Sequence, residues 1–202
     1  MRKDIRIGDI VCFRKPKGRD DGIVGNAIEF IQERIDGETI HVAPISSKLG
    51  DNYFTVQVDA KGVTLNYKQA LNSLDIAVVR PIELRIYPAE FNNAVNIWYS
   101  GLPKDSKTGK PDYDFFGAFR VGLLGFLSNL TGGRLWRRTI IKDNPVPFCS
   151  EAIAEIYYKL SQFRFIDKVN GMALTDENVL PHRDVYSNRK QFFVVKDYGE
   201  KL

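Results

Sequence analysis

Hydrophobic positions along the chain change their spacing from segment to segment, and the change predicts where strands and helices lie. Apolar runs and alternations with period two predict strands at residues 7–13, 39–45, 53–58, 63–65, 73–80 and 191–195. Apolar residues spaced by three or four predict helices at residues 23–35, 67–71, 88–99, 115–127 and 149–160. A meander of short strands with helices before and after it predicts an α+β fold.

Nothing in the sequence divides the chain, so residues 1–202 are expected to form a single domain. The apolar share of 44% excludes a disordered protein. The most apolar segment, residues 115–130, is interrupted by glycines and an arginine, which excludes a membrane span. The apolar run at residues 10–13 is too short for a signal peptide. These features predict a soluble protein that stays in the cytoplasm.

Basic residues outnumber acidic residues by 29 to 25, and they gather in two places. Residues 2–19 hold seven of them, and a second cluster consists of Arg134, Arg137, Arg138 and Lys142. Such clusters could contact nucleic acid, a phospholipid surface or a cell-wall polymer. No nucleic-acid-binding motif accompanies either cluster, so solvated faces are favoured and nucleic acid is not expected as a partner.

Chemistry that needs cysteine or histidine has four residues to draw on: Cys12, Cys149, His41 and His182. Two cysteines are too few for a fold that is held together by disulfides. A disulfide between Cys12 and Cys149 is not supported either, because the cytoplasm is a reducing compartment. The spacing of the four residues contains no close pair of zinc ligands, so neither a metal nor another cofactor is expected.

Cys149 follows the extended, proline-containing residues 144–148 and begins a predicted helix. The positive end of the helix dipole favours a thiolate, which is the nucleophilic form of cysteine. Position alone fits a reactive thiol and a buried structural cysteine equally well. Cys12 lies inside a strand and is expected in the core. His41 begins a strand and suits either a cleft or a structural contact, and His182 is expected on the surface.

Six short segments follow one another along residues 8–195. They read GDIVCFR at 8–14, IHVA at 40–43, VDAKGV at 58–63, LDIAVVR at 74–80, GKPDYD at 109–114 and FCSEAI at 148–153. In this order they resemble the motifs of YiiX-like proteins, which are circularly permuted members of the NlpC-type, papain-fold amidases and cysteine peptidases. Two departures are Ile40, where the family has Ser or Thr, and Pro44, which predicts a strand edge or a bulge.

The resemblance implies a circularly permuted papain-like fold, with a small antiparallel sheet or open barrel packed against helices. It also implies that the segments at about 81–112 and 161–202 vary within the family. Sequence order is free in such a site, because the catalytic groups need only meet in space.

The resemblance implies Cys149 as the nucleophile, His41 as the general base and Asp59 as the group that orients the imidazole. Asp51 and Gln57 are the rivals of Asp59 for the third role. Tyr113 and Asp114 are expected either to line the substrate cleft or to serve in packing and helix capping.

These roles predict a cysteine-dependent amide hydrolase that works through an acyl-enzyme. Its substrate would be a peptide, a peptidoglycan fragment or another acylated molecule. Acyl transfer through the same intermediate is the nearest alternative. A different hypothesis is a binding or structural module of a larger assembly such as a virion, with protein partners in that assembly.

Overall fold

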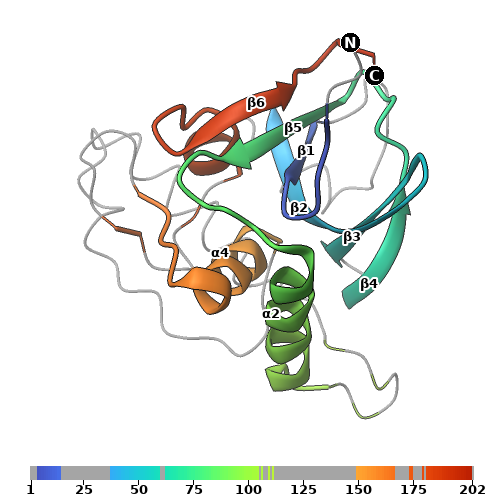
Figure 1. Ribbon diagram of the computed structural model, residues 1–202, viewed down its shortest axis with the longest axis vertical. Helices are drawn as coiled ribbons and strands as arrows, with labels where there is room; N and C mark the ends of the chain where they lie inside the picture. The colour runs from blue at the N-terminus through green and yellow to red at the C-terminus, as the bar shows by residue number, and fades with distance from the viewer. Residues whose placement is uncertain are drawn as a thin grey trace, which may run out of the picture.

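Six antiparallel strands form one sheet in the order β4-β3-β2-β1-β5-β6 (Figure 1). The strands are β1 (Ile10–Arg14), β2 (Thr39–Leu49), β3 (Asn52–Asp59), β4 (Gly62–Gln69), β5 (Ile76–Pro81) and β6 (Phe192–Lys196). The computed structural model describes residues 4–14, 37–59, 62–104, 149–166 and 181–201, and also 106, 109, 111, 173, 174 and 179. With the helices below, this sheet confirms the predicted α+β class.

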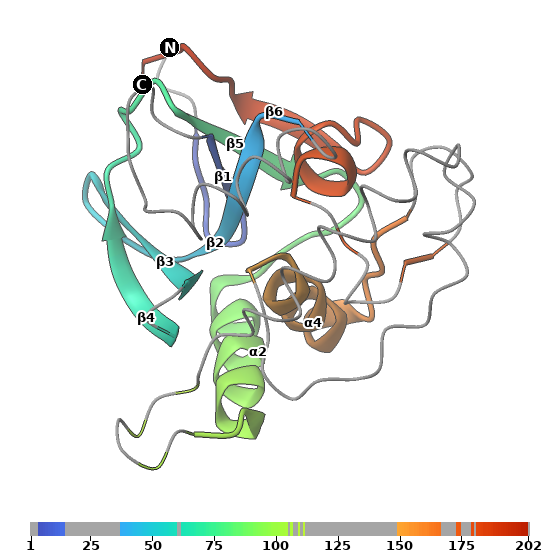
Figure 2. The same ribbon diagram turned by 180° about the vertical axis from the view of Figure 1, so that it is seen from behind.

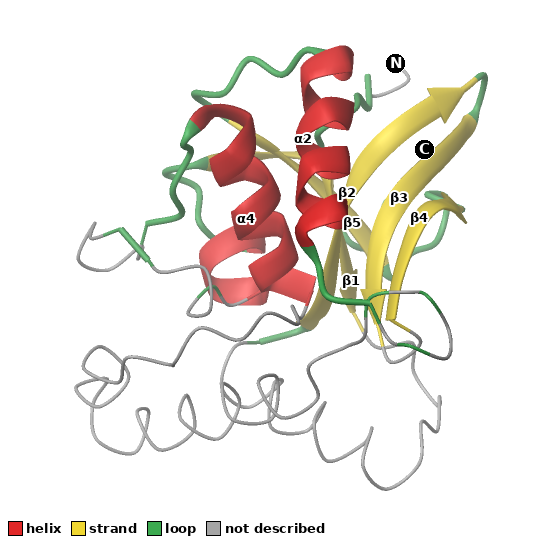
Figure 3. Cartoon of the chain, turned by 90° about the horizontal axis from the view of Figure 1, so that it is seen from below, coloured by secondary structure: helices red, strands yellow, loops and turns green. Residues whose placement is uncertain are grey.

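Two helices, α2 (Pro88–Gly101) and α4 (Cys149–Ser161), lie side by side against one face of the sheet (Figure 3). Trp98 of α2 donates its indole N–H to Glu155 of α4 at 2.6 Å, and Phe91 meets the ring of Tyr157 edge-on at 5.8 Å. A short π-helix, η3 (Pro181–Tyr186), precedes β6. In the parts of the chain that the structure describes, no helix has both the length and the apolar character needed to cross a membrane.

The strands β1 and β5 bury both of their faces, because their alternating residues enter two separate apolar clusters. Ile10 and Cys12 of β1 pack with the helices, in the cluster that includes Ile153 and Cys149. Val11, between them, joins a second cluster on the other face of the sheet, with Ile45 and Val78 among its members. The two-sided burial explains why β1 and β5 read as continuous apolar runs in the sequence.

The turn before β1, which contains Gly8 and Asp9, is hydrogen-bonded both to the sheet and to α4. The Asp9 carboxylate, 1% exposed, accepts two hydrogen bonds from the Arg80 guanidinium, at 2.6 and 2.8 Å. The buried Tyr157 of α4 donates its hydroxyl to the Gly8 carbonyl. Gly8 has a φ of +83°, and a Cβ there would lie 2.5 Å from a methyl carbon of Ile86. The Gly-Asp pair is thus required by the packing around this turn.

β2 is the strand on which the site is built, and its two sides differ. Residues 39–44 pair with β1, whereas the pairing with β3 runs from Ile45 to Leu49 and contains a bulge. Ile45 exchanges hydrogen bonds with Gly8 and Asp9 on the β1 side. By the alternation of an antiparallel ladder, Val42 and Pro44 therefore direct their backbone polar groups to the opposite side. The missing N–H of Pro44 falls just before the β3 pairing begins, so a proline is tolerated within this strand.

Two segments differ from the secondary structure predicted for them. Residues 67–71 were predicted as a helix, but β4 continues to Gln69 because Tyr67 and Lys68 pair with β3. The stretch after residue 160 was predicted as irregular, yet it contains η3. In residues 67–71, pairing with β3 outweighs the helical spacing of the apolar residues, because the segment is short. The helices predicted at 23–35 and 115–127 lie outside the described residues.

Candidate active site

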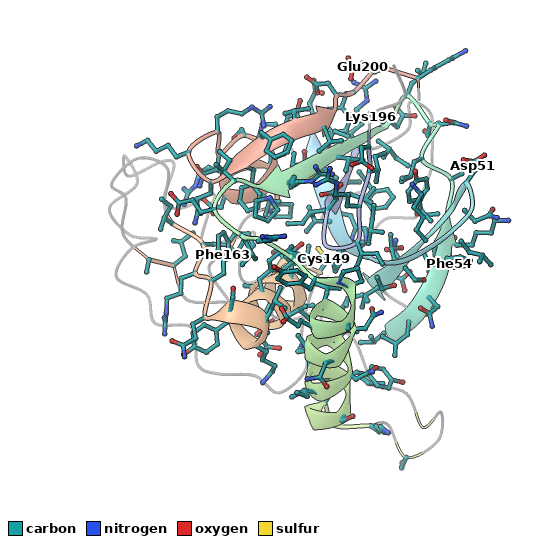
Figure 4. The ribbon with its side chains drawn as sticks, viewed as in Figure 1. Asp51, Phe54, Cys149, Phe163, Lys196 and Glu200 are labelled. Atoms are coloured by element: carbon teal, nitrogen blue, oxygen red, sulfur yellow. The ribbon has the colours of Figure 1, made fainter. Side chains whose placement is uncertain are left out.

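Cys149 is the first residue of α4 and lies where that helix meets the sheet (Figure 4). Its side chain is buried, with 4% of the residue exposed. The sulfur is hydrogen-bonded to the His41 side chain and to the backbone N–H groups of Val42 and Ser150. Val42 can supply its N–H because that stretch of β2 turns its free side away from β1. Three donors and a helix N-terminus thus converge on one sulfur atom.

The start of α4 is held in place at several points, so the position of the thiol is fixed by packing. Ser150 donates its hydroxyl to the carbonyl of Val179 at 2.6 Å. Further along the helix, Tyr157 is bonded to Gly8 and Glu155 to Trp98. The helix runs beside α2 and under the sheet, as the view from behind also shows (Figure 2). These contacts anchor α4 to a β-turn, to a neighbouring helix and to a separate chain segment.

His41 is half-buried on β2, and its ring is held on two sides. Its Nε2 atom lies 2.6 Å from Oε1 of Gln57 on β3. Its ring centroid lies 5.2 Å from that of Phe13, its pairing partner on β1. Since Nε2 faces Gln57, the hydrogen bond to Cys149 uses the other ring nitrogen, Nδ1. The imidazole therefore bridges the sulfur and the Gln57 amide.

The electrostatics of the pair favour a thiolate facing an imidazolium. Burial alone would raise the pKa of Cys149, but the His41 charge and the hydrogen bonds to the sulfur lower it below the usual 9.0. Burial alone would lower the pKa of His41, but the charge and hydrogen bond of Cys149, the Gln57 bond and the Asp59 charge raise it above 6.5. The two opposite shifts come from one interaction, and both favour transfer of the proton from the thiol to the imidazole.

The other cysteine and the other histidine have different surroundings. Cys12 is fully buried in the core, as predicted, and burial raises the pKa of its thiol. His182 was predicted on the surface, but the structure half-buries it in η3. Its Nδ1 lies 3.3 Å from the backbone nitrogen of Thr39, and its ring occupies the space that a Cβ on Gly37 would need. Both cysteines are free thiols.

The three candidates for the residue that orients the His41 imidazole lie at different places on β3 and on the turn before it. Gln57 is 6% exposed and makes the hydrogen bond to His41 Nε2. Asp59, at the exposed end of the strand, acts on His41 through its charge. Asp51 lies in the turn between β2 and β3, well away from Cys149 (Figure 4). Gln57, the rival of Asp59 for the third role, therefore makes a hydrogen bond to the imidazole, and Asp59 acts on the same ring through its charge.

Tyr113 and Asp114, the residues expected at the substrate cleft, lie outside the described part of the chain. Two features of the site were missed by sequence reasoning. The hydrogen bond from the Val42 N–H to the sulfur could not be predicted from the sequence, because this N–H is open to the sulfur only where β2 and β3 separate. The Thr55 hydroxyl, which accepts a hydrogen bond from Gln57 Nε2 at 2.9 Å, has a weak signal in the i, i+2 spacing of a strand.

The arrangement brings together a thiol with a lowered pKa, an imidazole that faces it and an amide that is hydrogen-bonded to the imidazole, which are the kinds of group that cysteine-dependent nucleophilic catalysis uses. In the described residues no three His, Cys, Asp or Glu side chains gather to hold a metal ion. No protein-family model matches the sequence, and no curated protein matches it at a significant level.

Proposed function

We propose that the protein is a cysteine-dependent hydrolase of amide bonds, with Cys149 as nucleophile, His41 as proton carrier and Gln57 as the residue that orients the imidazole. The observation that carries this proposal is the hydrogen-bonded Cys149–His41 pair at the start of α4, with Gln57 bonded to Nε2. An amide in the third position suffices, because the group has only to accept the Nε2 proton in a hydrogen bond.

The proposal includes the permuted papain-like fold suggested by the sequence motifs. Two features of the architecture support it. The histidine strand precedes the cysteine helix in the chain, and the two meet at the junction of the sheet with α4. The sheet is antiparallel and packs against helices on the face where that helix begins.

In the proposed reaction the Cys149 thiolate attacks the carbonyl carbon of the amide and forms a C–S bond. The negative charge that develops on the carbonyl oxygen is placed near the backbone N–H of Cys149, at the positive end of α4. His41 then transfers its Nδ1 proton to the amide nitrogen, and the C–N bond breaks. A water molecule that gives a proton to His41 attacks the thioester, the C–S bond breaks, the acid is released and the thiolate–imidazolium pair is restored.

The first test uses intact-protein mass spectrometry with wild type, Cys149→Ser and Cys12→Ser. Each variant is mixed with peptides, peptidoglycan fragments and acyl esters, with and without an added amine. We expect an acyl adduct on wild type and Cys12→Ser, released as free acid, and no thioester on Cys149→Ser. An adduct released only to the amine would assign acyl transfer. Substrate turnover that persists in Cys149→Ser would overturn the proposal.

A second prediction concerns pH. The lowered pKa of Cys149 sets the acid limb, because the thiolate is lost as the pH falls through that value. The raised pKa of His41 sets the alkaline limb, because the imidazolium that protonates the leaving amine is lost as the pH rises through that value. We therefore expect kcat/KM to follow a bell-shaped curve. Its acid limb should lie below the usual thiol value of 9.0, whereas a limb at 9.0 would contradict the ion pair.

A further inference from the structure

We propose that Thr55 is a positioning residue which fixes the direction of the Gln57 amide and thereby determines which nitrogen of His41 carries the permanent proton. This inference rests on the proposed function of the Cys149–His41 pair. Thr55 acts through Gln57 and His41, so its role is to set their hydrogen-bond directions.

A chain of three hydrogen bonds runs from β4 across β3 to β2. The Thr55 hydroxyl donates to the carbonyl of Tyr67, with 3.4 Å between the oxygens. The same hydroxyl oxygen accepts from Gln57 Nε2 at 2.9 Å. Gln57 Oε1 then lies 2.6 Å from His41 Nε2. Thr55 is fully buried and Gln57 nearly so, which shields the chain from competing water.

The direction of every bond in this chain follows from its first member. A backbone carbonyl can only accept, so the single proton of the Thr55 hydroxyl is directed to Tyr67. The remaining lone pairs of the hydroxyl face Gln57, which must present its NH₂ group to them. The carbonyl end of the amide is then the end that faces His41, and an acceptor there requires His41 Nε2 to be a donor.

A donor at Nε2 is the state that the proposed chemistry needs. With Nε2 permanently protonated, Nδ1 is the nitrogen that exchanges its proton with the Cys149 sulfur. If the Gln57 amide were reversed, its NH₂ group would face Nε2, which would then have to accept. The imidazolium, which has two donors and no acceptor, would lose its partner, and the thiolate would lose its counter-charge.

The test replaces the Thr55 hydroxyl with a methyl group of nearly the same shape. The variants are Thr55→Val, Thr55→Ser, Gln57→Glu and the Thr55→Val, Gln57→Glu double variant. Nitrogen-15 spectra of labelled imidazoles report the tautomer directly, and the chain has two histidines, so His182 serves as the internal reference. The second readout is the rate at which iodoacetamide alkylates Cys149 as a function of pH, measured by peptide mass spectrometry.

In wild type and Thr55→Ser we expect Nε2 to stay protonated while Nδ1 titrates. In Thr55→Val we expect a mixture of tautomers, a Cys149 alkylation midpoint displaced to higher pH, and alkylation at neutral pH about tenfold slower. A carboxylate offers acceptors on both oxygens, so Thr55→Val should have no effect on the tautomer in the Gln57→Glu background. This contrast separates a role in orientation from a general loss of stability, which would affect both backgrounds.

A wild-type tautomer in Thr55→Val would overturn the inference, as would a Thr55→Ser variant that behaves like Thr55→Val. The proposed function fails in a different way. In that case wild-type Cys149 would alkylate like an ordinary thiol, and His41→Ala would leave its alkylation rate unchanged. If Thr55→Val does not fold, Thr55→Ser and Gln57→Glu still test the inference, because both variants must keep Nε2 protonated, and a changed tautomer in either would overturn it.

Discussion

Replacing His41 with alanine is expected to lower kcat/KM for the best amide substrate by about 10²–10⁴-fold, which is the usual contribution of a positioned acid–base group. The reason is that His41 supplies both the charge that stabilises the Cys149 thiolate and the proton for the leaving amine. The rate should be measured at the optimum of the wild-type pH curve. The loss should be accompanied by slower alkylation of Cys149.

The matched control is His182→Ala, since the chain has one other histidine and the structure places it in η3 against Thr39 and Gly37. That variant is expected to keep kcat/KM within a few-fold of wild type. A loss in His182→Ala as large as that in His41→Ala would remove His41 from its proposed role. Circular dichroism on both variants distinguishes a lost catalytic group from a lost fold.

The same assay decides between the two candidates for the third position. Gln57→Ala removes the hydrogen bond to Nε2, so it should lower kcat/KM more than Asp59→Asn, which removes a charge near the ring. The opposite order would return the orienting role to Asp59, as the family resemblance first suggested.

Replacing Arg80 with alanine is expected to have the largest effect on stability, with a loss of about 3 kcal/mol in the free energy of unfolding. The Asp9 carboxylate is 1% exposed and receives two hydrogen bonds from the guanidinium, so the variant leaves a buried charge without its main partner. At roughly 2–4 °C per kcal/mol for a chain of this size, the melting temperature should fall by about 6–12 °C.

The loss in Arg80→Ala should also depend on pH, with a defined sign. Burial raises the pKa of Asp9, and the Arg80 guanidinium opposes that rise, so removing Arg80 raises the pKa further. When a carboxyl group has a raised pKa in the folded state, the folded protein loses stability as the pH increases through that folded-state pKa. The deficit relative to wild type should therefore shrink in acid. A double variant, Asp9→Asn with Arg80→Ala, should lose less than the sum of the single losses.

The motif at the start of β1 illustrates what the family resemblance could and could not predict. The Gly8–Asp9 pair contributed to the resemblance, and its placement before a buried strand was predicted from the alternation of apolar residues. Its purpose was not predictable, because the partners of these two residues are Arg80, Ile86 and Tyr157. They lie about 70 to 150 positions along the chain, and only folding brings them to the turn.

The sequence by itself determined the α+β class, most of the strands and the two residue types, cysteine and histidine, that meet where α4 begins. Apolar periodicity is a local property, and so is the start of the helix that was predicted at Cys149, where α4 begins in the structure. Tertiary structure decided which histidine meets Cys149, that Gln57 bonds its Nε2, and that the Val42 N–H is free to reach the sulfur. These contacts depend on where β2 and β3 diverge and on the pairing that converts residues 67–69 from an expected helix to strand. The physical reason is that hydrogen-bond partners across a sheet are set by strand register, which no local pattern records.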